Sequence, residues 1–159
     1  MTGSAGLLAG CGFTPVHGPQ GAGGNLMGTI RAEDPVNRRD FQFVSAFEER
    51  LGRPVAPRFT LAYAIAITET ERGTRRGEDA TRSLMRGQLD YVLAHPDGAE
   101  LASGQVGAST AYSLTDTRLA TLTAREDAEL RVIRMLVDSL VARLMLEPAL
   151  MPGPGAAPA

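Results

Sequence analysis

A stretch in which large and small side chains alternate, residues 59–68 (FTLAYAIAIT), constrains the fold more than any other feature of this chain. Phe, Leu, Tyr, Ile and Ile occupy the odd positions, and Thr or Ala occupies every even one. A period of two predicts a β-strand with one large apolar face and one face of small residues. The apolar face needs a second layer to cover it, and the small face allows another surface to approach closely.

Two further strands are predicted after it. Residues 69–81 (ETERGTRRGEDAT) carry many charges and two glycines, which predicts a long hairpin tip. Residues 82–94 form the next strand, and the turn 95–98 (HPDG) leads into a third strand at 100–114. In the third strand, Gly104 and Gly107 predict a bulge or a close backbone approach.

The faces of these two strands follow from the same alternation. In residues 82–94 the apolar face has Met85, Leu89, Tyr91 and Leu93, and the polar face has Arg86, Gln88 and Asp90. In residues 100–114 one face has Ala102, Val106, Ala108 and Tyr112.

Two segments have the period of an amphipathic helix. In residues 37–51, Phe43, Val44, Phe47 and Leu51 fall on one face, and Gly52 is a stop signal. The second helix is expected over residues 119–146, with Thr123 and Glu126 as a capping box near its start. Its apolar stripe consists of Ile133, Leu136, Val137, Leu140, Val141 and Leu144.

These elements, with a weaker strand in residues 25–32, give the order β-α-β-β-β-α. The three later strands are joined by hairpins and should be antiparallel. We therefore predict an α/β fold of the α+β type, a two-layer sandwich with two helices packed on one face of a four-stranded, mostly antiparallel sheet.

The only cysteine of the chain, Cys11, ends the sequence Leu-Leu-Ala-Gly-Cys. Small residues before a thiol near the start are typical of a lipobox, at which Cys11 is acylated and becomes the first residue. No Lys or Arg precedes it, so we expect the true start to lie upstream. We predict a signal-peptide remnant at 1–10, a lipidated flexible tether at 11–24, a folded domain at 25–147 and a disordered tail at 148–159.

The sequence contains no metal-ligand spacing, phosphate loop or nucleophile elbow, so we predict no enzyme, no catalytic residue, no metal and no cofactor. The formal net charge of −2 argues against nucleic acid as a partner. Arg72, Arg75 and Arg76 could grip phosphates bidentately from the hairpin tip. The alternative is a solvated turn, because the same loop carries Glu69, Glu71, Glu78 and Asp79.

Three segments carry a resemblance to a known family. They are Cys11-Gly12-Phe13-Thr14-Pro15-Val16-His17-Gly18, then Ala111-Tyr112-Ser113-Leu114, and then Ala120-Thr121-Leu122 with Arg125-Glu126-Asp127-Ala128. Together they resemble the lipopolysaccharide-assembly lipoproteins, LptE, of the alphaproteobacterial branch. The resemblance extends from Cys11 to about Leu146 and includes the order of the elements.

The resemblance implies a lipoprotein at the periplasmic face of the outer membrane, held there by its lipid. It implies an LptD-type β-barrel as partner, whose lumen the lipoprotein plugs while the two proteins deliver lipopolysaccharide to the cell surface. Lipopolysaccharide itself is then an expected ligand, and Arg72, Arg75 and Arg76 are its candidate phosphate contacts. The alternative is another periplasm-facing outer-membrane lipoprotein, such as a small-ligand carrier or a secretion pilot.

Overall fold

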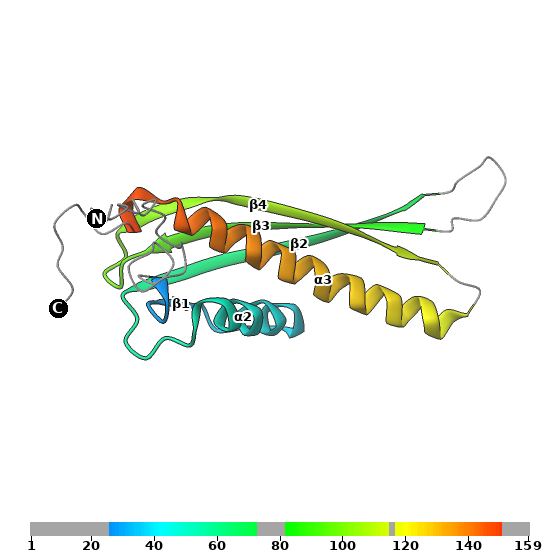
Figure 1. The fold of residues 1–159 in the computed structure, drawn as a ribbon, viewed down its shortest axis with the longest axis horizontal. Coiled ribbons are helices and arrows are strands. Elements are labelled where there is room, and N and C mark those ends of the chain that lie inside the picture. Colours follow the sequence, from blue (N-terminus) through cyan, green and yellow to red (C-terminus); the bar gives the residue numbers. More distant parts are fainter. Residues whose placement is uncertain (1–25, 73–81, 115–116, 151–159) are drawn as a thin grey trace, which may run out of the picture.

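The protein folds into two layers, a four-stranded sheet and a pair of helices (Figure 1). The computed structural model describes residues 26–72, 82–114 and 117–150. Its elements are β1 (Ile30–Ala32), α2 (Arg38–Leu51), β2 (Phe59–Arg72), β3 (Arg82–Ala94), β4 (Glu100–Ser113), α3 (Arg118–Met145) and the short 3-10 helix η1 (Pro148–Leu150). The predicted α+β fold and the order β-α-β-β-β-α are confirmed.

The strands lie in the sheet in the order β1-β2-β3-β4, which is also their order along the chain. β2, β3 and β4 pair antiparallel as successive hairpins. β1 pairs parallel to β2, from Ile30 opposite Phe59 to Ala32 opposite Leu61. This pairing is parallel because α2 carries the chain back between the two strands.

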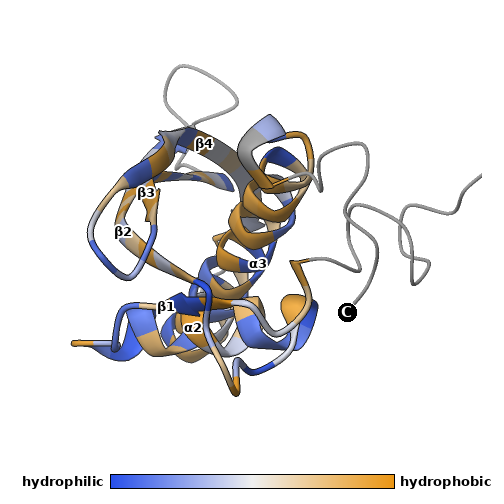
Figure 2. Ribbon diagram, turned by 90° about the vertical axis from the view of Figure 1, so that its left-hand side faces the viewer, coloured by the Kyte–Doolittle hydropathy of each residue, from blue (hydrophilic) through white to orange (hydrophobic). Residues whose placement is uncertain are grey.

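The core lies between the sheet and the two helices. Figure 2 shows the sheet curving round α3, with α2 beside β1. Every apolar residue predicted for the inner face of β3 is buried, as is every member of the predicted stripe of α3. The sequence pattern therefore assigned the inner side of both elements correctly.

Helix α2 begins where the sequence predicts. The N-cap Asn37 accepts a hydrogen bond from the backbone N–H of Asp40 at 3.0 Å, which satisfies one of the free donors of the first turn. Phe43, Phe47 and Leu51 are buried along one face. The Phe43 ring packs on Tyr63 of β2, with 4.4 Å between centroids, so this face covers the start of the sheet.

The predicted hairpin tip begins too early in the sequence, at residue 69. The structure continues β2 through Arg72, so residues 69–72 belong to the strand and pair with residues 82–85 of β3. Charged side chains weaken a strand signal in the sequence, but the neighbouring β3 supplies a backbone partner for each of these residues. Residues 73–81, with Arg75 and Arg76, lie outside the described residues.

The second helix begins one residue before its predicted start, but its predicted capping box is wrong. Helix α3 begins at Arg118 with Thr117 as N-cap, so Thr123 and Glu126 lie inside the helix and form no capping box. The Thr123 hydroxyl donates to the Leu119 carbonyl at 3.1 Å, the back-bond typical of a threonine within a helix. Glu126 and Asp127 consequently lie beyond the first turn of the helix.

The glycines of β4 have roles that the sequence predicted in part. The bulge in the β3–β4 pairing lies between Leu93 and Ala94, away from both glycines. Gly104 does permit a close approach, since a Cβ there would lie 3.2 Å from the Tyr91 hydroxyl oxygen. The predicted turn at 95–98 is present, with Gly98 at φ +91° and its N–H donating to the His95 carbonyl.

Candidate functional site

The face of the sheet opposite the helices is the first candidate surface, and we call it the outer sheet face. It is built from the alternate residues of β2, β3 and β4 that point away from the core. Most of its members are small or polar: Thr60, Ala62, Ala64, Ala66, Thr68, Arg86, Gln88, Asp90, Gln105, Gly107 and Ser109. Leu84 and Val92 of β3 are the large apolar residues on the same face, and Val92 is 38% exposed. No described element covers this face (Figure 1).

Polar contacts between neighbouring strands organise the centre of the outer sheet face. Asp90 of β3 lies opposite Gln105 of β4 in the register, and the Gln105 amide donates to its carboxylate at 2.5 Å. The Gln88 amide reaches the other oxygen of Asp90 at 3.5 Å. The Asp90 carboxylate is thus held in place by two amides, and the surface around it remains flat and polar.

A shallow groove of about 580 Å³ crosses this face near the middle of β4. It exists because the strands carry glycine and alanine there, which leave the sheet surface low. Its lining residues are Ala66, Thr68, Arg86, Gly87, Gln88, Gln105, Gly107, Ala108, Ser109 and Met135. Gly87 and Ala108 belong to the helix side of the sheet, and Met135, which is 39% exposed, comes from α3 on that side, so the groove is not confined to the outer sheet face.

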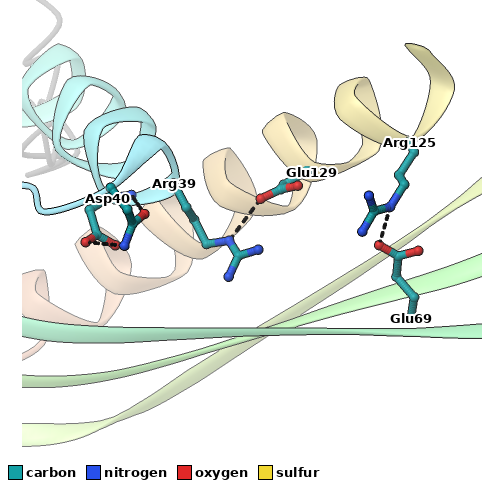
Figure 3. A network of polar contacts seen from close by, with 6 residues as sticks. Arg39, Asp40, Glu69, Arg125 and Glu129 are labelled. Carbon is teal, nitrogen blue, oxygen red and sulfur yellow. Dashed lines mark hydrogen bonds and ion pairs between the residues drawn. The ribbon is translucent and has the colours of Figure 1, made fainter. Parts of the chain in front are cut away.

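The second candidate region is a charged network that joins α2, α3 and the far part of β2 (Figure 3). Arg39 donates from Nε to Glu129 at 2.9 Å, and Arg125 donates from Nε to Glu69 at 2.7 Å. The hydrogen bond to Glu69 raises the pKa of Arg125 above its ordinary value. The hydroxyl of Tyr112 donates to the second oxygen of Glu69 at 3.0 Å, so this carboxylate links three elements.

No sequence pattern predicted this network. Glu69 was expected in the hairpin tip and Glu126 near a helix start, whereas Glu69 pairs across the molecule with Arg125 and Glu126 lies 3.5 Å from Arg38. Arg39 and Glu129 are 90 positions apart in the sequence. Only the signs of the charges could have suggested such pairs, and many other pairings have the same signs.

The predicted phosphate contacts lie mostly outside the described residues. Arg72 is the last residue of β2, whereas Arg75, Arg76 and the predicted lipidation site Cys11 are not described. In the register Arg72 lies opposite Arg82, the first residue of β3.

Two searches of the described residues bear on other kinds of site. Within residues 26–72, 82–114 and 117–150, no three His, Cys, Asp or Glu side chains come together as metal ligands. In the same part of the chain, none of the helices is both long and apolar enough to cross a membrane. His95 lies in the β3–β4 turn, and its ring packs 5.5 Å from that of Phe59.

Comparison with solved structures identifies the fold in other bacterial proteins. A crystal structure from Caulobacter crescentus CB15, provisionally described as a lipoprotein, matches with a TM-score of 0.65 and 22% identity, over 80% of this chain and 96% of that one. A solution structure of lipoprotein B from Nitrosomonas europaea matches with a TM-score of 0.55 and 10% identity, over 74% and 80%. A minor lipoprotein from Acinetobacter baumannii matches with a TM-score of 0.53 and 11% identity, over 74% and 88%.

These likenesses are at low identity and establish a shared fold. The proteins that share it are described as lipoproteins. No protein-family model matches the chain, and no curated protein matches it.

Proposed function

We propose that this protein is a lipid-anchored lipoprotein of the bacterial outer membrane that partners an LptD-type β-barrel in the assembly of lipopolysaccharide. The outer sheet face is the observation that carries the proposal. A plug for a barrel must present small and polar side chains to a polar wall, and this face does so without a described element covering it. The fold shared with proteins described as lipoproteins supports the same role.

The anchor in this proposal is Cys11. One acyl chain gives marginal membrane binding and two or more give stable attachment, at about 0.8 kcal/mol per buried methylene. An acylated Cys11 followed by a tether rich in Gly and Pro holds the folded domain close to the bilayer while leaving it free to turn toward its partner.

The change Cys11→Ala tests the anchor. We expect it to abolish acylation and release the protein from the membrane fraction, because the thiol is the acceptor of the lipid. Labelling of cells with a fatty-acid probe measures this directly. Equal labelling of mutant and wild-type protein would refute the anchor.

Depletion of the protein in its own host tests the role in lipopolysaccharide assembly. We expect less lipopolysaccharide at the cell surface and a lower level of the folded LptD-type barrel. Normal surface lipopolysaccharide after complete depletion would reject the role. Recovery from detergent-solubilised outer membrane with a different envelope partner, and no such barrel, would favour a secretion pilot or a ligand carrier.

A substitution on the outer sheet face tests which surface docks. Ala66 is exposed on β2, lies opposite Gln88 and lines the groove. Ala66→Glu places a charge where a close partner would lie, so we expect less co-purification with the barrel at unchanged thermal stability. Ala66→Ser is the matched control and should co-purify normally. Equal recovery of both variants would show that the barrel contacts another surface.

In this proposal the arginines of the β2–β3 tip meet the phosphates of lipid A. Charge reversal of Arg72, Arg75 and Arg76 should then weaken binding of lipopolysaccharide without unfolding the domain, because guanidinium groups bind phosphate through paired hydrogen bonds. Unchanged binding would mean that this loop is an ordinary solvated turn.

A further inference from the structure

The charged network contains two guanidinium groups that each bind a carboxylate through Nε alone. Arg39 and Arg125 both use Nε for their carboxylates, Glu129 and Glu69. Among the described residues, neither arginine makes a hydrogen bond through its terminal Nη atoms. Figure 3 shows these free ends pointing toward each other across the space between α2 and α3.

The two free ends line one pocket. It has a volume of about 190 Å³ and lies between the start of α2 and the early turns of α3. Its lining is polar throughout: Arg38, Arg39, Gln42, Arg125, Glu126 and Glu129. A water molecule takes about 30 Å³ of liquid, so the pocket has room for a tetrahedral group of a few heavy atoms.

The arrangement brings three positive side chains to one pocket, and the carboxylate of Glu129 lies near two of them, Arg39 and Arg125. Arg38 and Arg39 lie in the first turn of α2, where the helix dipole is positive and cations are disfavoured. Arg125 approaches from α3, and the carboxylate that orients it is fixed in turn by the Tyr112 hydroxyl. The Nη ends of Arg39 and Arg125 that line the pocket would both attract an added anion.

Both positive and negative side chains line the pocket. Three arginines line it against two glutamates, Glu126 and Glu129, and Arg125 is also paired with Glu69, which does not line the pocket. Glu126 lies 3.5 Å from Nη1 of Arg38, and Glu129 accepts from Nε of Arg39, so each carboxylate already has one arginine partner. The terminal Nη groups of Arg39 and Arg125 remain as donors, and these can bind an acceptor with negative charge.

We propose that this pocket is a binding site for an oxyanion of the phosphate class, gripped from two sides by Arg39 and Arg125. A planar guanidinium presents two parallel N–H groups to a phosphate, and two such groups meet different pairs of oxygens. The ligand is a free phosphate or the phosphate of a lipid headgroup, which share this chemistry. The site is separate from the tip that carries Arg72, and it does not depend on the proposed barrel partner.

Calorimetry on the full chain, expressed without acylation and at low ionic strength, tests the site with inorganic phosphate as the probe. We expect millimolar binding by the wild type, and binding weakened about ten-fold or more in Arg39→Gln and in Arg125→Gln, because each change removes charge-assisted hydrogen bonds. Arg53→Gln is the matched control and should bind like the wild type. Arg53 also pairs through Nε, with Glu48 at 3.0 Å, but it does not line the pocket.

A second variant guards against loss of the fold. Arg39→Lys keeps the positive charge beside Glu129 but lacks the planar pair of donors, so it should fold and still bind more weakly than the wild type.

Flotation with phosphatidylcholine vesicles, with and without phosphatidic acid, then identifies the source of the bound phosphate. Binding only to the phosphatidic acid vesicles, lost in Arg125→Gln, identifies a lipid phosphate, and phosphate binding without flotation identifies a soluble one. No phosphate binding by the wild type, or equal binding by all variants, would overturn the proposal.

Discussion

At the scale of single residues, Gly87 sets how closely α3 packs on the sheet. A Cβ at this position would lie 2.4 Å from Cγ1 of Val132 and 2.9 Å from Cδ1 of Leu136. Both partner side chains are buried, so neither can move away freely. The sequence gives no sign of this contact, because a glycine within a strand pattern does not reveal which helix crosses it.

We predict that Gly87→Ala lowers the free energy of unfolding by about 1–3 kcal/mol, the cost of forcing an extra methyl group into a packed core. Gly107→Ala is the control on the neighbouring strand. A Cβ there would meet only the Gly87 carbonyl oxygen, at an ordinary 3.7 Å. Denaturant unfolding of both variants measures the difference, and equal effects would contradict the close packing.

Tyr63 is a second residue whose environment only the fold defines. Burial, followed by the negative charges of Asp40, Glu33 and Asp34, raises the pKa of Tyr63 from 10.0 to about 12. Helix α2 contributes to this burial, since its Phe43 ring packs against Tyr63.

This shift predicts the direction of an alkaline stability change. A pKa that is higher in the folded than in the unfolded state stabilises the protein below pH 10, and this contribution is lost as the pH rises from about 10 to about 12. Tyr63→Phe should therefore flatten the fall in stability over this range. It should also remove a phenolate component with a midpoint near 12 from the ultraviolet titration. An unchanged titration curve would show that Tyr63 is not the tyrosine with the raised pKa.

At the scale of elements, the starts of the two helices illustrate what local signals can and cannot predict. For α2 the predicted range began at Asn37, and this residue is the N-cap whose side chain makes the capping hydrogen bond. For α3 the expected cap, Thr123, lies inside the helix. The helix begins at Arg118, one residue before the predicted start, and Leu119 and Leu122 in its first turns are exposed.

Alanine substitutions should distinguish the capping role of Asn37 from the position of Thr123 inside a helix. Asn37→Ala removes a cap and should cost about 1 kcal/mol of stability. Thr123→Ala replaces a β-branched residue inside a helix with the best helix former, so it should leave stability unchanged or raise it slightly. Thermal unfolding measures both. A loss of stability in Thr123→Ala equal to that in Asn37→Ala would restore the capping box.

At the scale of the whole molecule, the two ends of α3 differ in how much of the helix is buried against the core. Its buried residues begin at Ala128, so the first turns of this 28-residue helix extend beyond the main core. The ion pair between Arg125 and Glu69 and the partly buried Ala124 tie this part to the rest of the fold (Figure 3). Ion pairs of this kind are weak when exposed, so the early turns should open more easily than the rest.

Hydrogen exchange should detect this difference. We expect faster exchange for backbone amides in residues 121–126 than in residues 132–141, and a further increase at 121–126 in Glu69→Gln. The change removes the charge that orients Arg125 but preserves the shape of the side chain. Uniform exchange along α3, in both proteins, would mean that the helix behaves as one rigid unit.

The sequence by itself determined the strands, the helices and the side of each that faces the core. This is possible because burial repeats with the period of each element, every second residue in residues 59–68 and every third or fourth in residues 133–144. Only the tertiary structure decided where β2 ends and which charges pair. Glu69 meets Arg125, and Arg39 meets Glu129, because the sheet and the helices bring distant segments together, and no local pattern records that distance.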